Sequence, residues 1–248
     1  MGMKFNKLFI VGIGPGSLDQ MSRTAYQVLK EVEVIVGYKT YLNLIDDMIS
    51  ENQEVYASGM RKEKERAKKA IELTKKGYKV AIISSGDAGV YGMAGLVYEL
   101  IEEQDCKIET EVIAGITAAN AAASILGAPL MHDYAVISLS DLLTPWQQIE
   151  KRLKAAAQAD FITALYNPSS SKRTEQIKIA RNIFLQYRQE KTPVGIVQSA
   201  GRENEEKIIT NLAEMLENDI NMLSTVIIGN SETYVSADKM ITPRGYNV

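Results

Sequence analysis

The sequence has very little cysteine, histidine and tryptophan, with one of each in 248 residues. The single cysteine, Cys106, excludes an internal disulfide, and with the single histidine, His132, it excludes a zinc site of the usual cysteine and histidine type. It also excludes an iron–sulfur cluster held by the chain's own thiolates. We therefore expect no protein-bound metal, and the cysteine usage favours a cytoplasmic protein.

An excess of positive charge and a long apolar segment are also missing. The chain has 28 Lys and Arg and 31 Asp and Glu, which gives a net charge of -3. We therefore expect no nucleic-acid partner. The uncharged stretch 112–131 has about the length that spans a bilayer, but Gly, Thr, Asn, Ser and Pro interrupt it. We interpret it as a strand end, a turn and an alanine-rich helix, and expect no membrane association and no signal peptide.

What the sequence does contain is a series of short apolar runs rich in β-branched residues. These runs lie at 8–11, 34–36, 80–83, 112–113, 135–137, 161–165, 194–197 and 226–228. Such runs are typical of parallel strands buried on both faces. Amphipathic stretches of helical length lie between them, at 61–76, 90–104 and 172–186, and Thr144 and Pro145 predict a capped helix start that runs to about Gln158. The fold class is therefore α/β with mainly parallel sheets.

The chain is expected to form two domains. Gly127, Ala128 and Pro129 end one helical stretch before the strand at 135–137 begins. We place the boundary there, with an N-terminal α/β domain at 1–130 and a C-terminal α/β domain at 131–248. Two such domains would leave an interdomain cleft for a ligand.

The turns directly after the apolar runs are rich in glycine, serine and asparagine. In parallel sheets ligands bind beyond the carboxyl ends of the strands, so these turns are the candidate binding elements. They lie at 12–17, 84–93 and 114–119 in the first half, and at 138–141, 166–169, 199–202 and 229–231 in the second. We expect the second set to open on one side of its sheet.

The first turn is similar to a dinucleotide fingerprint but departs from it. Ser17 stands where the third glycine belongs, Pro15 removes a backbone donor, and no acidic residue ends the second strand to bind a ribose. A nicotinamide-dependent oxidoreductase therefore stays a different-class alternative. The charged run 61–69 is either a solvated helix face or a patch that binds substrate carboxylates, with Arg61 best placed for the second role.

Five segments, taken in order, resemble the tetrapyrrole methylase family, whose members use S-adenosylmethionine to methylate corrin and sirohaem precursors. The segments are 36–41, 58–60, 84–94, 137–146 and 164–168, and the resemblance covers nearly the whole chain. It implies a homodimer of two-domain subunits, S-adenosyl-L-methionine in the cleft and a tetrapyrrole substrate beside it. It further implies methylation of carbon 17 of a corrin precursor with ring contraction; a methylase acting at another carbon of a corrinoid precursor is the alternative.

The resemblance also assigns roles to individual residues. Cofactor-binding roles fall on Pro15, Ser85, Gly86, Asp87, Val90, Thr117, Ala118, Tyr166, Asn167, Ala200, Pro243 and Gly245. Tyr38, Asp87 and Asp141 are candidate catalytic residues for proton transfer because they lie in turns expected to face the cleft. Lys39 and Arg61 are candidates for substrate binding. Related uroporphyrinogen methylases have an acid where Tyr38 stands, so their acid–base residues do not carry over.

Overall fold

The protein is described over residues 7–247 from a computed structural model of the chain. Packing divides the chain into two compact units, one ending at Ala118 and the other beginning at Ala119, which we call unit 1 and unit 2. Helix α5 (Ala118–Leu126) shares a hydrophobic cluster with the strands of unit 2 through Ala119 and Leu126. The division therefore falls at the start of this helix, and a domain boundary after residue 130 stays a prediction.

Unit 1 is built on a parallel five-stranded sheet with strand order β3-β2-β4-β1-β5. Its strands are β1 (Lys7–Gly12), β2 (Val34–Tyr38), β3 (Glu54–Ser58), β4 (Val80–Ser84) and β5 (Glu109–Ile113). All five carboxyl ends consequently meet at one edge of the sheet.

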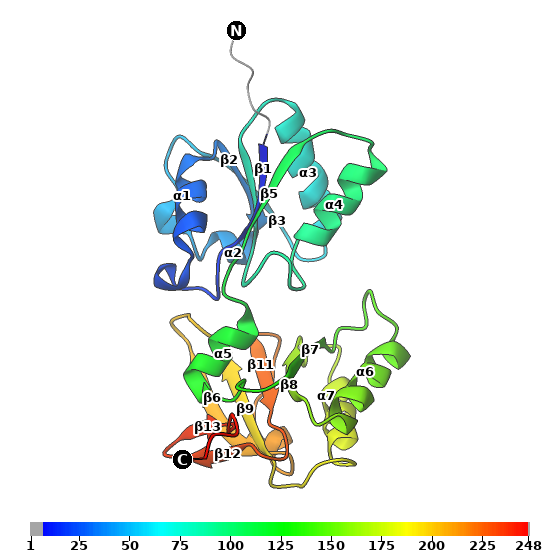
Figure 1. Cartoon of the computed structure of the whole chain (residues 1–248). Helices are drawn as coiled ribbons and strands as arrows, with labels where there is room; N and C mark the ends of the chain where they lie inside the picture. The colour runs from blue at the N-terminus through cyan, green and yellow to red at the C-terminus, as the bar shows by residue number, and fades with distance from the viewer. Residues whose placement is uncertain (1–6, 248) are drawn as a thin grey trace. The chain divides into compact units, whose positions relative to one another are not determined.

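Helices cover both faces of this sheet (Figure 1). Helices α1 (Arg23–Glu31) and α2 (Lys39–Leu42) lie on one face, and α3 (Glu63–Lys75) and α4 (Ala94–Glu103) on the other. Along β1, Leu8 and Ile10 pack towards α3 and α4, whereas Phe9 and Val11 pack towards α1. Because both faces are buried, successive residues must all be apolar, which explains the continuous run in the sequence.

Unit 2 contains a mixed five-stranded sheet with strand order β10-β9-β11-β8-β7. Its strands are β7 (Tyr134–Ser138), β8 (Ile162–Tyr166), β9 (Pro193–Gln198), β10 (Glu206–Asn211) and β11 (Ser224–Ile228). Strand β11 is antiparallel to both neighbours, β8 and β9. The prediction of a parallel strand at 226–228 is therefore wrong, because an apolar run reports burial on two faces but not strand direction. The α/β class with two α/β parts is confirmed.

The two faces of this sheet are covered differently. Helices α6 (Trp146–Gln158) and α7 (Glu175–Phe184) pack on one face. Helix α5 and a small sheet of β6 (Gly127–Ala128), β13 (Lys239–Ile241) and β12 (Tyr234–Ser236) belong to the other. Helix α6 ends at Gln158 as predicted, but Pro145 is its N-cap and no side chain caps it, so the predicted Thr144 cap is wrong.

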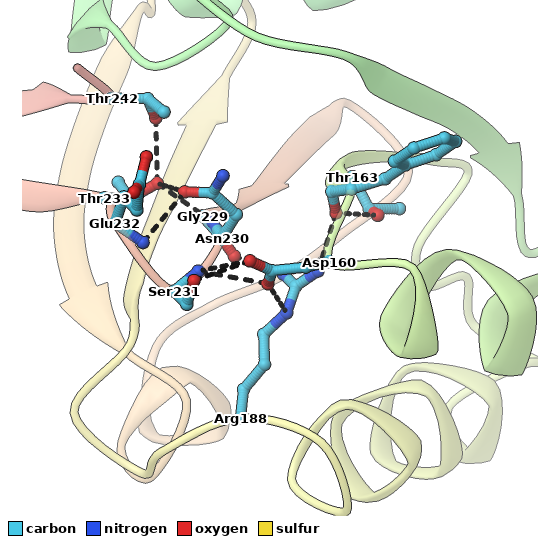
Figure 2. A network of polar contacts seen from close by, with 10 residues as sticks. Asp160, Thr163, Arg188, Gly229, Asn230, Ser231, Glu232, Thr233 and Thr242 are labelled. Carbon is cyan, nitrogen blue, oxygen red and sulfur yellow. Dashed lines mark hydrogen bonds and ion pairs between the residues drawn. The ribbon is translucent and has the colours of Figure 1, made fainter. Parts of the chain in front are cut away.

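A buried polar network fastens the amino edge of β8 to the carboxyl end of β11 (Figure 2). Arg188 donates through Nη2 to the Phe161 carbonyl at 2.7 Å and through Nη1 to the Gly229 carbonyl. Its Nε lies 3.4 Å from Asp160 Oδ1, and Asp160 also accepts from the Ser231 hydroxyl at 2.6 Å. Burial lowers the pKa of Arg188 to about 10, with Asp160 opposing the shift.

Turn 229–231 therefore lies at the edge opposite the turns that follow β7, β8 and β9. The expectation that all these polar turns open on one side is wrong for this one, because β11 runs antiparallel. Within residues 7–247, no helix is both long and apolar enough to span a membrane.

Candidate functional site

The carboxyl edge of unit 1 brings three glycine-containing loops together. Strands β4, β1 and β5 are neighbours, so the loops after them, 12–17, 84–93 and 114–118, start side by side. Gly14 and Gly86 exchange backbone hydrogen bonds of 3.1 and 2.7 Å. Both have positive φ, +78° and +69°, a conformation that glycine adopts without steric cost.

The backbones of these loops are packed too closely for side chains. A Cβ atom on Gly115 would lie 2.1 Å from the Gly86 carbonyl oxygen, and one on Gly12 would lie 2.7 Å from the same oxygen. Both separations are well below contact distance, so any larger residue would push the loops apart. The glycines of the sequence pattern thus serve loop-to-loop contact.

Asp87 joins two of the three loops. Its Oδ1 accepts from the Gly89 N–H at 2.8 Å, and its Oδ2 accepts from the Gly115 N–H at 2.9 Å. Nearby, the buried Ser84 hydroxyl accepts from the Met93 N–H ahead of helix α4. Since both Asp87 oxygens already bind backbone donors, this geometry favours a positioning role for Asp87, while its predicted proton transfer stays a prediction.

The other donor-binding residues predicted in the first half lie on the same three loops. Pro15 follows β1, Ser85 and Val90 follow β4, and Thr117 and Ala118 follow β5. Val90 is 37% exposed and Ile116, beside Thr117, is 40% exposed. The loops therefore offer apolar side chains together with backbone polar groups.

A second corner of the same edge is formed by β2 and β3. Tyr38 and Ser58 are register partners at the ends of these strands, and Lys39 begins the helix after Tyr38. Arg61, in the turn after Ser58, is exposed. The structure thus brings Tyr38, Lys39 and Arg61 to one corner, beside the loops described above.

Sequence reasoning missed Arg66, which lies behind this corner. The charged run 61–69 reads as a solvated face, yet Arg66 is only 4% exposed and bonds Ser58 and Gly59. The signal was present in the sequence: Arg66 precedes Ala70 by four residues and Leu73 by seven, so it shares the buried face of α3.

In unit 2 the predicted residue Tyr166 ends β8, Asn167 follows it, and Ala200 follows β9. The Tyr166 hydroxyl accepts from the Ala119 N–H at 2.7 Å. Asn167 has a φ of +49°, and Ser199, beside Ala200, has +50°. Left-handed backbone at residues with side chains is uncommon, and such residues cluster at functional sites.

Side-chain hydrogen bonds hold this edge of unit 2. Asn167 Nδ2 donates to the Ser138 hydroxyl at 3.0 Å, and Arg173 Nη2 donates to the Asn167 carbonyl at 2.8 Å. Sequence reasoning missed Arg173, although it closes the polar segment between β8 and α7. Asp141, after β7, is exposed and accepts from Gln176 Nε2 at 3.0 Å.

Pro243 and Gly245 lie in a different place. They follow Thr242, whose hydroxyl donates to the Pro129 carbonyl. The Thr242 hydroxyl also lies 2.8 Å from the Thr233 hydroxyl (Figure 2). Thr233 in turn bonds Asn230, after β11, so Thr242 belongs to the network at the amino edge of β8. The donor-binding role of Pro243 and Gly245 stays a prediction.

The polar and apolar groups on the three loops of unit 1 indicate which kind of ligand the loops fit. Loops 12–17, 84–93 and 114–118 contain no Lys or Arg, so no side-chain cation is available there for a phosphate. Backbone N–H and C=O groups with exposed apolar side chains suit an uncharged nucleoside moiety such as that of S-adenosylmethionine. Among residues 7–247, His, Cys, Asp and Glu form no group of three that could hold a metal ion.

Comparisons with known proteins identify the family of the chain. Residues 7–216 match the tetrapyrrole (corrin/porphyrin) methylases. The chain is 54% identical over 244 residues to the cobalt-factor III methyltransferase of Priestia megaterium, covering 97% of this chain but 45% of that relative, so it spans less than half of the relative's length. It is 51% identical over 241 residues to the probable cobalt-factor III C(17)-methyltransferase of Salmonella typhimurium, covering 97% of this chain and all of that relative.

Solved structures show the same likeness. The crystal structure of the methyltransferase CobJ has a TM-score of 0.90 at 32% identity, over 95% of this chain and 99% of CobJ. The cobalt precorrin-4 methyltransferase CbiF has a TM-score of 0.77 at 22% identity, over 92% of this chain and 97% of CbiF. At this identity the similarity is one of fold. From the family match and these relatives together, this chain belongs to the tetrapyrrole (corrin/porphyrin) methylases.

Proposed function

We propose that the chain is an S-adenosylmethionine-dependent C(17)-methyltransferase of cobalamin biosynthesis, which methylates precorrin-3B or its cobalt counterpart with contraction of the ring. One observation carries the proposal: the identity of 51% to the Salmonella relative spans that relative's whole length, and its name specifies carbon 17. A methylase acting at another carbon of a corrinoid precursor is the alternative within the family.

The donor would be held mainly by unit 1. S-adenosyl-L-methionine supplies an electrophilic methyl group on a sulfonium, and the electron pair of the broken S–C bond stays on sulfur. Gly86, Ser85, Thr117 and Ala118 would bind it through loop backbone, and Val90 would cover its apolar parts. The protein's contribution is alignment and exclusion of water, and the direct backbone contacts of the loops support such a fixed site.

The tetrapyrrole would lie at the corner of β2 and β3. A corrin precursor is a flat ring with several carboxylate side chains, so it needs cations at its rim and apolar or aromatic surface for its face. Lys39 and Arg61 supply the cations, and Tyr38 supplies a ring and a hydroxyl. Tyr38 and Asp141 are our candidates to move protons during ring contraction.

In unit 2, the candidate donor-binding residues are Tyr166, Asn167, Ala200, Pro243 and Gly245. We include a homodimer and a cytoplasmic location in the proposal. The family resemblance supports the homodimer, and the single cysteine supports the location.

The test is incubation of the purified chain with S-adenosylmethionine and, separately, precorrin-3B, cobalt-precorrin-3 and cobalt-factor III. We expect one added methyl by mass spectrometry and the absorption spectrum of a contracted ring, and the ring that reacts identifies the metal state of the substrate. Calorimetric titration should show binding of S-adenosylhomocysteine and not of NAD. Donor binding without methylation of any of the three rings would overturn the substrate assignment, and methylation at another carbon would favour the alternative.

A further inference from the structure

A buried guanidinium ties together the turn that follows β3. Arg66, on helix α3, donates from Nη1 to the Ser58 hydroxyl and to the Gly59 carbonyl, both at 2.9 Å. Its Nη2 lies 3.3 Å from Glu63 Oε1, a carboxylate that is about half exposed. A buried charge is costly unless it is paired and hydrogen-bonded, so these contacts fix the position of Arg66 closely.

The same guanidinium also lies over an aromatic ring of the neighbouring strand. Its central carbon is 5.7 Å from the centroid of the Tyr38 ring, within the range of a cation–π contact. Tyr38 in turn packs edge-on against Tyr41, with centroids 5.1 Å apart and an angle of 85° between the rings. Arg66 therefore contacts both elements of the corner, the Tyr38 ring and the turn after Ser58.

This turn has a conformation that needs support. Arg61 has a φ of +61°, which is unfavourable for a residue with a side chain. Next to it, Met60 is 57% exposed, and no atom lies within 4 Å of where a Cβ on Gly59 would be. With little packing of its own, the turn depends on the hydrogen bonds from Arg66 to Ser58 and Gly59.

We propose that Arg66 is a positioning residue for the macrocycle. It fixes the turn that carries Met60 and Arg61, and it fixes the orientation of the Tyr38 ring. It thereby determines how the protein binds the carboxylates and one face of the macrocycle. The inference rests on the function proposed above, since it names a residue that shapes the same substrate site. It predicts an effect on the ring substrate and not on the methyl donor, whose loops follow β1, β4 and β5.

The experiment compares Arg66→Lys with Lys64→Met, a variant that removes an exposed cation from the same helix. Lysine keeps the charge but lacks the planar fork that bonds Ser58 and Gly59 while lying over Tyr38. For Arg66→Lys we expect KM for the tetrapyrrole to rise roughly tenfold to a hundredfold, while the affinity for S-adenosylhomocysteine stays unchanged. The melting temperature should fall slightly, because the buried hydrogen bonds to Ser58 and Gly59 are weakened. Lys64→Met should keep both KM and donor affinity.

A second variant separates positioning from a general structural role. Tyr38→Leu should raise KM for the ring, and adding Arg66→Lys to it should raise KM by less than the two single changes combined, because both remove the same contact. An unchanged KM in Arg66→Lys, or a parallel loss of donor affinity in that variant, would overturn the proposal.

The two proposals fail in different ways. If the proposed function is wrong, the wild-type protein itself methylates no ring substrate or methylates it at a carbon other than 17. If only the role of Arg66 is wrong, the wild type is active and Arg66→Lys behaves like Lys64→Met. Titration of the ring followed by absorbance gives the same comparison of the variants without turnover.

Discussion

The carboxyl edges of the two sheets are held together in different ways. In unit 1 the loops contact each other through backbone atoms, with glycines where a Cβ would collide. In unit 2 the loops after β7 and β8 are joined by side chains, Asn167 to Ser138 and Arg173 to Asn167. The first arrangement tolerates almost no added atom, whereas the second can lose one hydrogen bond and keep its shape. Sequence change should therefore be far more damaging at the edge of unit 1.

The largest expected effect is at Gly115. The added methyl of Gly115→Ala would lie 2.1 Å from the Gly86 carbonyl oxygen, and overpacking of this severity costs roughly 3 kcal/mol. We expect loss of S-adenosylhomocysteine binding by calorimetry and a lower free energy of unfolding in urea. Gly95→Ala is the matched control: a Cβ there meets no atom within 4 Å in helix α4, and it should stabilise by about 0.5–1 kcal/mol. Equal behaviour of the two variants would contradict the close-contact argument.

Asp87 comes next, because its two hydrogen bonds join the loops of β4 and β5. Asp87→Ala leaves two backbone N–H groups without this partner, and we expect destabilisation by about 1–3 kcal/mol with roughly tenfold weaker donor binding. Asp87→Asn retains one acceptor oxygen, so its stability and its affinity for the donor should lie between those of wild type and Asp87→Ala. If Asp87 acts by proton transfer instead, Asp87→Asn would lose turnover while binding the donor as tightly as wild type.

A smaller effect is expected in unit 2. Asn167→Ala and Ser138→Ala each remove the 3.0 Å hydrogen bond between these side chains, at a cost of about 1 kcal/mol in the free energy of unfolding. Because they remove the same bond, the double variant should be destabilised by about 0.5–1 kcal/mol less than the sum of the single variants. Simple additivity would show that the edge of unit 2 is not held by this pair.

The smallest effect is expected at the surface. The hydrogen bond from Lys207, followed by its charge, lowers the pKa of Asp238. A carboxyl whose pKa is lower in the folded than in the unfolded protein stabilises the fold at pH values above its unfolded pKa. This stabilisation is lost as the pH falls through the folded pKa. The melting temperature of wild type should therefore exceed that of Asp238→Asn slightly at neutral pH, and the two should converge below about pH 4. Glu31→Gln removes the similar pair with Lys79 in unit 1, and its melting temperature should show the same dependence on pH relative to wild type.

Much of the fold could be predicted because buried strands have a simple sequence pattern. Two of the strands that were missed, β3 and β10, are edge strands, in which polar and charged residues such as Glu54 and Lys207 interrupt the apolar residues. An edge strand is only partly covered, so it needs no continuous apolar run. The direction of β11 was missed because hydrogen-bond pairing, not burial, decides it.

The site was predictable to the extent that turns follow strands. The glycine loops and Asp87 were located by their positions after β1, β4 and β5. Arg66 and Arg173 were missed because a long cation is expected at the surface. For Arg66 the helical spacing to Ala70 and Leu73 indicated burial, whereas only the fold reveals that both guanidinium groups bond a loop carbonyl. Turn 229–231 was misplaced because its strand runs the other way.

Strand β6 pairs with β13, so Gly127 and Ala128 lie beside Met240 and Ile241. Met240 also belongs to the hydrophobic cluster beneath α5. During synthesis domains generally fold as units, the N-terminal one first, and the residues that pack together as unit 1 end at residue 118. Unit 2 cannot close its small sheet until residue 241 has left the ribosome, so from its own synthesis until then α5 exposes apolar surface of the kind that chaperones bind.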